Sequence, residues 1–314
     1  MLTGLNAYRS AQRPPRPPAM PEIARIDRAR LLDYGGTGRP VLFVPSLINP
    51  PYVLDLAEQN SMLRWLAQQG VRTLLLDWGD PRAGGETLSV GGHVEELLLP
   101  LIAALGEAPL LAGYCLGGTM ALAAAALAET AGVITIAAPW RFDGFPDESR
   151  ADLARLWQTY HAPAEALGLF PMEFLQTAFW QLDPQRTLTK YADYGALAPD
   201  SPEAVGFVTL EDWANDGPPL TVAAARELLE DMFGANLPGT RAWRVGGTVI
   251  DPGALRCPLL NIVSTRDRIV PATSAPEAGE SILLDQGHVG MVTGRRAMSG
   301  LWTILARWIS DRAR

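Results

Sequence analysis

Short apolar runs alternate along the chain with longer segments that have the apolar spacing of a helix. The runs that predict buried strands are rich in aliphatic residues and lie at 41–44, 71–78, 109–114, 132–138, 258–264 and 281–284. The segments that predict helices lie at 53–69, 93–105, 116–129 and 295–313. This alternation predicts an α/β protein with a doubly wound, mostly parallel sheet.

Two segments depart from the alternation. Residues 22–34 alternate apolar and polar positions, which predicts strands at a sheet edge. Residues 142–240 hold helical segments, aromatic residues and many prolines, but no strongly apolar strand. They are too many for a loop, and we expect an inserted lid over the carboxyl edge of the sheet. Residues 241–250 resemble a hairpin with a Gly-Gly turn that returns the chain to the core.

These patterns divide the chain into three parts. Residues 1–21 are rich in proline and predict a flexible or extended tail without the apolar stretch of a signal peptide. Residues 22–141 and 241–314 are expected to form the core, and residues 142–240 the lid. The uncharged stretch 108–128 is long enough to span a membrane, but its Pro and Gly residues divide it into strand, turn and helix. We therefore expect no membrane span.

Composition narrows the classes of function. The chain has 314 residues, 48% of them hydrophobic, and a net charge of −8, which argues against a general binder of nucleic acid or anionic membranes. Two cysteines are too few for a disulfide framework, which favours a reduced, cytoplasmic protein. His93, His161 and His288 lie far apart without the spacing of metal ligands, so no metal is expected.

The residues with the clearest chemical signal are those around Cys115. The sequence Gly-Tyr-Cys-Leu-Gly at 113–117 stands between a predicted strand and a predicted helix. This is the pattern of a nucleophile elbow with Cys in place of Ser. Gly113 and Gly117 are expected because larger side chains would collide with the strand or helix. The start of the following helix favours a Cys115 thiolate.

An elbow of this kind also provides donors for an oxyanion. The backbone N–H of Leu116 follows the nucleophile and is expected to be one donor. The second is expected from the loop after strand 41–44, either from Leu47 or from its neighbour Ile48.

A nucleophilic cysteine needs a base, and the base needs a residue that orients it. Elbow enzymes place these residues in the order nucleophile, acid, histidine. Asp267 follows strand 258–264 and His288 follows strand 281–284, so the order matches. Asp267 could instead cap a turn, in which case Asp251 is the alternative acid. Cys257 is expected to be a buried apolar residue, and His93 and His161 to be surface or packing residues.

Several longer motifs extend the pattern. They are GYCLGGT at 113–119, VPSLINPPYVLDL at 44–56, LEDWANDGPPL at 210–220, CPLLNIVSTRDRIVP at 257–271 and GHVGMVTGRRA at 287–297. With them the chain resembles the poly(3-hydroxyalkanoate) synthases over roughly residues 22–312, and most of all the short catalytic subunit of two-component synthases. The resemblance implies an α/β-hydrolase fold with a helical lid. One departure is Arg268, where that family usually has His after the acid.

The resemblance also implies a reaction without a cofactor. Cys115 would attack the thioester of a 3-hydroxyacyl-CoA, and a hydroxyl would then attack the acyl-enzyme and lengthen a polyester. His288 would be the general base, and Asp267 would orient it or help to activate the hydroxyl. The implied partners are the acyl-CoA and the growing polyester. A homodimer, a second synthase subunit and a place at the surface of a polyester granule in the cytoplasm are compatible with this reaction.

Two other functions fit the same residues. One is a thioesterase, esterase or polyester depolymerase that uses the same triad, since hydrolysis differs from elongation only in which hydroxyl attacks. The dienelactone hydrolases have a very similar elbow but lack a lid of this size. The other is a non-catalytic protein that binds polyester granules. The matched order of Cys115, Asp267 and His288 argues against it, because binding alone does not need that set.

Overall fold

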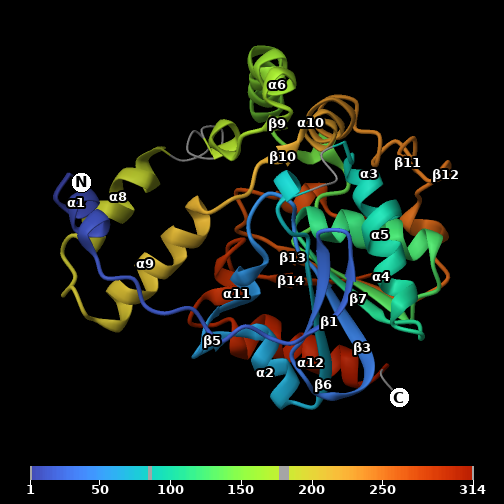
Figure 1. Ribbon diagram of the computed structural model, residues 1–314, viewed down its shortest axis with the longest axis horizontal. Coiled ribbons are helices and arrows are strands. Elements are labelled where there is room, and N and C mark those ends of the chain that lie inside the picture. The colour runs from blue at the N-terminus through green and yellow to red at the C-terminus, as the bar shows by residue number, and fades with distance from the viewer. Residues whose placement is uncertain (1, 84–86, 177–183, 313–314) are drawn as a thin grey trace.

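The computed structural model describes residues 2–83, 87–176 and 184–312 and is built around one eight-stranded sheet (Figure 1). The strand order is β1 (Glu22–Ile26), β2 (Ala29–Asp33), β6 (Val71–Asp77), β3 (Thr37–Val44), β7 (Leu110–Tyr114), β8 (Gly132–Ile136), β13 (Leu259–Ser264) and β14 (Glu280–Leu284). β1, β2 and β6 pair antiparallel, and every pair from β6 to β14 is parallel. The predicted mostly parallel sheet is confirmed, and residues 22–34 form the strands predicted for its edge, which pair antiparallel.

Helices cover both faces of the sheet. The described helices of the core are α2 (Met62–Gln68), α3 (Val90–His93), the π-helical η3 (Val94–Leu98), α4 (Leu99–Ala104), α5 (Leu116–Leu127), α11 (Gly290–Thr293), the π-helical η8 (Met298–Trp302) and α12 (Thr303–Ser310). Short 3₁₀ turns are η1 (Pro51–Leu54), η2 (Pro81–Ala83), η4 (Phe142–Gly144), η6 (Pro252–Ala254) and η7 (Ala272–Ser274). The uncharged stretch 108–128 forms β7 and α5, as predicted. Among the described helices, none combines the length and apolar character that a membrane crossing requires.

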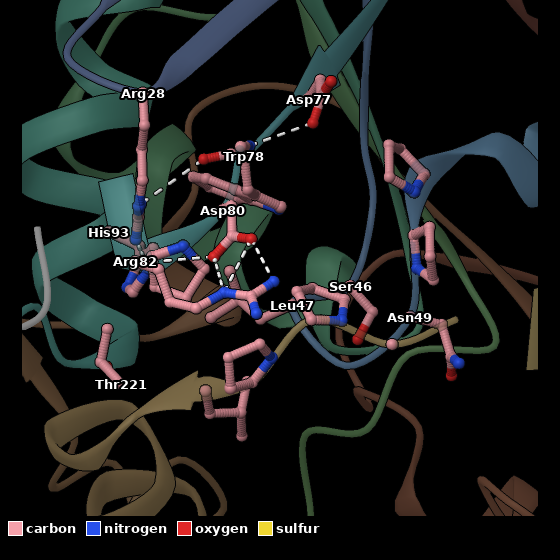
Figure 2. Close-up of a pocket in the computed structure, with 18 of the residues that line it drawn as sticks. Arg28, Ser46, Leu47, Asn49, Asp77, Trp78, Asp80, Arg82, His93 and Thr221 are labelled. Carbon is pink, nitrogen blue, oxygen red and sulfur yellow. Dashed lines mark hydrogen bonds and ion pairs between the residues drawn. The ribbon is translucent and has the colours of Figure 1, made fainter. Parts of the chain in front are cut away.

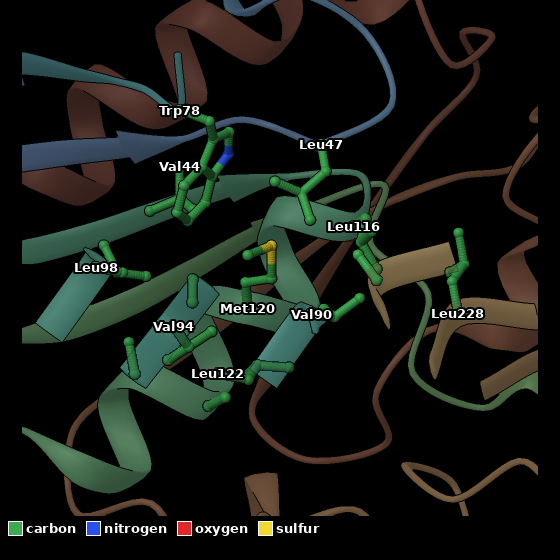
Figure 3. Packing of buried hydrophobic residues seen from close by; sticks show 14 of the residues in the cluster. Val44, Leu47, Trp78, Val90, Val94, Leu98, Leu116, Met120, Leu122 and Leu228 are labelled. Atoms are coloured by element: carbon green, nitrogen blue, oxygen red, sulfur yellow. The ribbon is translucent and has the colours of Figure 1, made fainter. Parts of the chain in front are cut away.

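Alternation along the buried strands creates two apolar cores, one on each face. In β3, Leu42 and Val44 pack with α5 in one core, whereas Val41 and Phe43 pack with α2 and α12 in the other. Successive side chains of a strand point to opposite faces, so a strand covered on both faces must be apolar throughout. Figure 3 shows the first core, where α5 packs against the end of β3. This packing fixes the loops at the carboxyl edge of the sheet.

The segment predicted as a helix at 53–69 is helical only in its second half. Residues 55–57 and 60–61 form two short antiparallel strands, β4 (Asp55–Ala57) and β5 (Asn60–Ser61). Ser61 caps α2 by accepting from the N–H of Arg64 at 3.1 Å, and the Arg64 side chain donates back to the buried Asp55 at 2.8 Å. The cap and the buried ion pair begin the helix at residue 62, and the apolar pattern alone does not reveal them.

The described part of residues 142–240 lies at the top and at the left of Figure 1. Their described elements are α6 (Asp147–Leu167), β9 (Leu169–Phe170), α8 (Pro184–Tyr194), α9 (Pro202–Asn215), β10 (Leu220–Thr221), α10 (Val222–Arg226) and the π-helical η5 (Glu227–Gly234). β9 pairs only with β10, and neither joins the main sheet. The chain then forms the hairpin of β11 (Arg244–Val245) and β12 (Thr248–Val249), whose Gly-Gly turn has the positive φ angles expected at that position.

The first residues differ from the flexible or extended tail expected for 1–21. Residues 2–10 form α1 (Leu2–Ser10), which packs on α8 at the left of Figure 1. The two helices approach closely at Gly4, where an added Cβ would lie 1.7 Å from the carbonyl oxygen of Tyr191. Glycine at position 4 therefore permits a packing that composition does not reveal.

A buried carboxylate connects residues 142–240 to the core and leads to a stability prediction. Glu227 accepts hydrogen bonds from the indole N–H of Trp243 at 2.6 Å and the backbone N–H of Gly91 at 2.9 Å. We expect Glu227→Ala to lower the free energy of unfolding by about 2–4 kcal/mol, because two buried donors lose their acceptor. Urea unfolding measures the change. Glu227→Gln keeps one acceptor oxygen and should lose about half as much; equal losses in both variants would contradict this explanation.

Candidate active site

Cys115 stands in a strained turn between β7 and α5. Its φ angle is +56°, a value that residues with a side chain rarely adopt. The backbone N–H of Cys115 donates to the carbonyl oxygen of Ile136 at 2.9 Å, and its carbonyl oxygen accepts from the N–H of Gly118 at 2.9 Å. These bonds hold a conformation that costs on the order of 1–3 kcal/mol, and such strain is typical of functional sites.

The glycines on either side of Cys115 allow the turn to pack against the sheet. A Cβ on Gly117 would lie 2.1 Å from the carbonyl oxygen of Val44 in β3. A Cβ on Gly113 would lie 2.4 Å from the carbonyl oxygen of Gly117. Both distances are far below van der Waals contact. Larger side chains at positions 113 and 117 would therefore collide with the neighbouring backbone, as the sequence pattern predicts.

His288 and Asp267 come from the loops after β14 and β13, and the structure brings them together. The Nδ1 of His288 lies 2.5 Å from Oδ2 of Asp267. The other carboxylate oxygen, Oδ1, accepts from the backbone N–H groups of Ile269 and Val270 at 2.7 and 2.9 Å. The Asp267 side chain is fully buried and its position is fixed by these bonds. The carboxylate therefore orients the imidazole, with Nε2 on the opposite side of the ring.

Cys115 completes the set of three. It lines the same cavity as His288, close enough for its charge to act on the imidazole. The ring of Tyr114 stacks on the imidazole with centroids 4.9 Å apart, and the Tyr114 hydroxyl donates to the carbonyl oxygen of His288 at 3.2 Å. Sequence reasoning missed Tyr114, although its place beside Cys115 in the elbow is a signal that could have been used.

The charge state of His288 is set by its neighbours. Burial alone would lower its pKa, but the charges of Cys115 and Asp267 and the hydrogen bond to Asp267 raise the pKa from 6.5 to about 10. The imidazole is therefore protonated at neutral pH, which makes it a ready proton donor beside the Cys115 sulfur.

This charge balance can be tested by titration. In Cys115→Ala the interaction with the charge of Cys115 is lost while burial remains, so we expect the His288 pKa to fall below its wild-type value of about 10. NMR titration of the imidazole resonances measures it, and three histidines are few enough to assign individually. Cys257→Ala is the matched control and should leave the titration unchanged. An equal pKa in wild type and Cys115→Ala would show that the thiolate does not raise it.

Cys115 and His288 open into a cavity of about 420 Å³. Its wall beneath α9 is largely apolar and includes Met172, Leu210 and Trp213. Its polar lining includes Arg266, Arg268 and one ion pair, in which Lys190 Nζ lies 2.8 Å from both carboxylate oxygens of Glu211. The cavity suits a ligand with a mainly apolar body and a few polar groups.

The expected oxyanion donors lie in two places. Leu116 is the first residue of α5, so its N–H has no acceptor within the helix. Leu47 and Ile48 follow β3, and the N–H of Ile48 already donates to the side chain of Ser46 at 3.1 Å. Ile48 borders the catalytic cavity, whereas Leu47 has a buried side chain that packs near Leu116 (Figure 3).

Comparison with known proteins identifies the family. A model described as "Alpha/beta hydrolase family" matches residues 41–298, most of the chain and both sides of the elbow. The chain belongs to the α/β hydrolase family. The predicted α/β-hydrolase fold is therefore confirmed.

Several relatives of this α/β hydrolase carry the name "Poly(3-hydroxyalkanoate) polymerase subunit PhaC". The chain is 28% identical to the one from Haloferax mediterranei, over 93% of this chain and 63% of that protein. It is 27% identical to the one from Synechocystis sp., over 87% of this chain and 78% of that protein, and 27% identical to the one from Allochromatium vinosum, over 87% and 81%. The resemblance to these polymerases is thus confirmed, although the chain spans less than two thirds of the haloarchaeal relative's length.

Solved structures agree at the level of the fold. A thermophilic esterase from Thermogutta terrifontis has a TM-score of 0.57 and 17% identity, over 94% of this chain and 100% of that one. A monoacylglycerol lipase from Paleococcus ferrophilus has a TM-score of 0.54 and 14% identity, over 90% and 99%. At these identities the likeness establishes the α/β-hydrolase architecture and nothing about the reaction.

The remaining candidates of the sequence lie elsewhere in the hydrolase fold. Asp251 accepts from the N–H of Gly253 at 2.9 Å and caps η6, so it does not replace Asp267 beside His288. Cys257 is partly buried and accepts from the Thr130 hydroxyl at 3.4 Å. Within the described residues, no group of three His, Cys, Asp or Glu side chains is arranged to hold a metal ion.

A second cavity of about 370 Å³ adjoins the loop after β3, and Figure 2 shows it. It shares Ser46, Asn49 and Pro50 with the catalytic cavity. His93 lies in its wall and is buried, as expected for a packing residue and not for a surface residue. Its Nε2 lies 2.7 Å from the Arg28 guanidinium. Burial and the Arg28 charge lower the His93 pKa to about 4, so this imidazole is neutral. Sequence reasoning missed this cavity, because its residues come from five separate stretches of chain.

Proposed function

We propose that this chain is a poly(3-hydroxyalkanoate) synthase-like acyltransferase that forms an acyl-thioester on Cys115 and transfers the acyl group to a hydroxyl. The observation that carries the proposal is the buried arrangement of Cys115, His288 and Asp267 at one end of a mainly apolar cavity. Its support is the likeness to relatives named as polymerases, which extends over about nine tenths of the chain.

The first half of the reaction is acylation. The Cys115 thiolate attacks the carbonyl carbon of a 3-hydroxyacyl-CoA, and the carbonyl oxygen becomes an oxyanion. The backbone N–H groups of Leu116 and Leu47 bind this oxyanion; Leu47 is favoured over Ile48 because the Ile48 N–H is engaged by Ser46. The C–S bond to CoA then breaks, and the departing sulfur takes a proton from the His288 imidazolium.

The second half is transfer to a hydroxyl. His288, now neutral, accepts the proton of the attacking hydroxyl at Nε2, while Asp267 stabilises the imidazolium that forms. The hydroxyl oxygen bonds to the acyl carbon, and the bond to the Cys115 sulfur breaks. The products are an ester longer by one unit and a Cys115 thiolate paired with protonated His288. Protons and charges balance without a cofactor.

The choice of sulfur over oxygen fits this sequence of steps. Exchange of one thioester for another changes the free energy little, and the acyl-thioester stays reactive toward an alcohol. Water must be kept from that intermediate. We propose that residues 142–240 act as the lid that does so, since α9 supplies much of the cavity wall. We propose that residues 22–141 and 241–314 form the core on which this lid is inserted.

The proposal extends to partners and location. The relatives' names include the word "subunit", which supports an assembly with a second protein or a second copy of this chain. The substrates are a 3-hydroxyacyl-CoA and the growing polyester. We propose a cytoplasmic protein that acts at the surface of polyester granules.

Product analysis tests the proposal. The purified chain is incubated with 3-hydroxybutyryl-CoA, and the products are identified by mass spectrometry, with Cys115→Ala as control. Oligomers or polymer that vanish in the variant support the synthase. Free 3-hydroxybutyrate alone would mean that water attacks the acyl-enzyme and would replace the proposal by a thioesterase. Absence of CoA release from the wild type, alone and with a bacterial extract that contains polyester granules, would contradict both.

A further inference from the structure

Residues 2–18 contact α8, α9 and, next to the main sheet, η1 and α2. At one end, Tyr8 of α1 packs edge-on against Tyr191 of α8 and Phe207 of α9, with ring centroids 5.8 and 6.3 Å apart. Ala7 and Ala11 pack on the same small apolar cluster. α1 therefore joins α8 and α9 through a packed aromatic contact.

Polar bonds fix the same residues to one side of α9. The Tyr8 hydroxyl donates to Oδ1 of Asp212 at 2.6 Å. Arg13 donates to both carboxylate oxygens of Asp212, at 3.0 and 3.1 Å. Arg13 also donates to the carbonyl oxygens of Tyr8 and Ala11 at 2.8 and 2.7 Å, which closes the chain around this carboxylate.

The following residues reach the core. Arg16 donates to Asp216, just after α9, at 2.7 Å, and its guanidinium lies 4.2 Å from the ring centroid of Tyr52. Tyr52 itself donates to Asp216 at 3.1 Å. Two residues later the carbonyl oxygen of Pro18 accepts from Arg64 of α2 at 2.7 Å. The segment Leu2–Pro18 thus connects the outer end of α9 to the core, and we call it the N-terminal strap.

The other side of α9 forms the wall of the catalytic cavity. Glu211 and Trp213, the neighbours of Asp212, both line it. Trp213 also donates from its indole N–H to the carbonyl oxygen of Pro50, in the loop after β3 that borders the cavity. A change in the position of Asp212 would therefore act directly on residues that line the cavity.

We propose that the N-terminal strap is a positioning element for the catalytic site: Tyr8, Arg13 and Arg16 hold α9 through Asp212 and Asp216 so that Glu211 and Trp213 cover Cys115. None of the strap residues touches the cavity around Cys115. Only the predicted effect on the acyl substrate rests on the proposed function. Access of a reagent to the Cys115 sulfur can be measured without any acyl substrate.

The direct test is the rate of alkylation of Cys115 by iodoacetamide, followed by mass spectrometry of its peptide. The full chain carries Asp212→Ala with Asp216→Ala, which removes the acceptors for all three strap residues. We expect the Cys115 rate to rise at least about fivefold, the lower end of couplings between separate sites. Cys257 is the internal reference and should react at the same rate in both proteins. Asp152→Ala, which breaks the exposed Asp152–Arg155 pair on α6, should behave as wild type.

A milder variant separates positioning from a general loss of folding. Tyr8→Phe removes one bond to Asp212 and keeps the aromatic packing, so we expect a smaller rise in the Cys115 rate with unchanged circular dichroism. Asp212→Glu keeps the charge and should restore most of the protection. If hydrogen exchange shows that residues 2–10 have become mobile while the Cys115 rate stays at its wild-type value, the inference is wrong.

An activity readout then relates the strap to the reaction. With 3-hydroxybutyryl-CoA we expect the double variant to raise KM more than it lowers kcat and to increase the share of free acid among the products, because water reaches the acyl-enzyme. A proportional loss of kcat with unchanged KM and unchanged product ratio would overturn the positioning role. Failure of the proposed function would instead appear as no activity in the wild type, while the alkylation result would still stand.

Discussion

Cys115→Ala is expected to abolish CoA release and acyl transfer, with a loss of at least about 10⁴-fold, as for the removal of a nucleophile from other hydrolytic triads. The variant removes the sulfur whose charge acts on His288, and the other cysteine, Cys257, does not line the cavity. Its fold should be preserved, because alanine is smaller than cysteine and therefore fits the same turn, at a φ angle of +56° that cysteine already adopts. Release of CoA, followed with a thiol reagent, measures the loss.

Two matched variants interpret this result. Cys257→Ala removes the other thiol, which lies away from the cavity, and should keep wild-type activity. Cys115→Ser keeps a nucleophilic atom but makes an ester intermediate, which is a deeper trap, so turnover should fall steeply while a covalent adduct can accumulate. If Cys115→Ala retained more than a small fraction of the wild-type rate, Cys115 would not be the nucleophile.

The second large effect is on stability. Gly117→Ala places a Cβ 2.1 Å from the carbonyl oxygen of Val44, which belongs to the sheet and cannot move away independently. We expect the free energy of unfolding to fall by about 3–5 kcal/mol, in the range caused by overpacking and backbone strain. Urea unfolding followed by tryptophan fluorescence measures it.

Gly206→Ala is the matched control for that experiment. Gly206 lies within α9, and a Cβ there would meet no atom within 4 Å. The same substitution should therefore stabilise the chain by up to about 1 kcal/mol, since alanine favours a helix more than glycine does. Similar losses of stability in Gly117→Ala and Gly206→Ala would show that the contact with Val44 is not the cause.

The sequence predicted the sheet well because its strands are buried on both faces. Val41–Val44 and Leu74–Leu76 are apolar at every position, and only a covered, parallel strand requires that. The pairing of Asp267 with His288 could also be anticipated, because parallel strands end at the same edge and both residues follow such strands. Both patterns can be recognised from short stretches of sequence, and each is typical of one arrangement in α/β proteins.

What the sequence did not reveal depends on contacts between distant residues. α1 forms because Gly4 and Tyr8 meet α8 and α9, nearly two hundred residues away, whereas the prolines nearby indicate an extended tail. The helix expected from residue 53 begins only at 62 because Ser61 and Asp55 bond to Arg64. His93 is buried beside Arg28 from the edge strands, a pairing that no spacing in the sequence encodes.

The central claim is that the acyl group is carried on Cys115, and the most direct test is intact-protein mass spectrometry after rapid quenching with 3-hydroxybutyryl-CoA. The account predicts an increase in mass by one or more hydroxybutyryl units, located on the Cys115 peptide and absent in Cys115→Ala. CoA release without any adduct on that peptide, or an adduct that persists in Cys115→Ala, would contradict it.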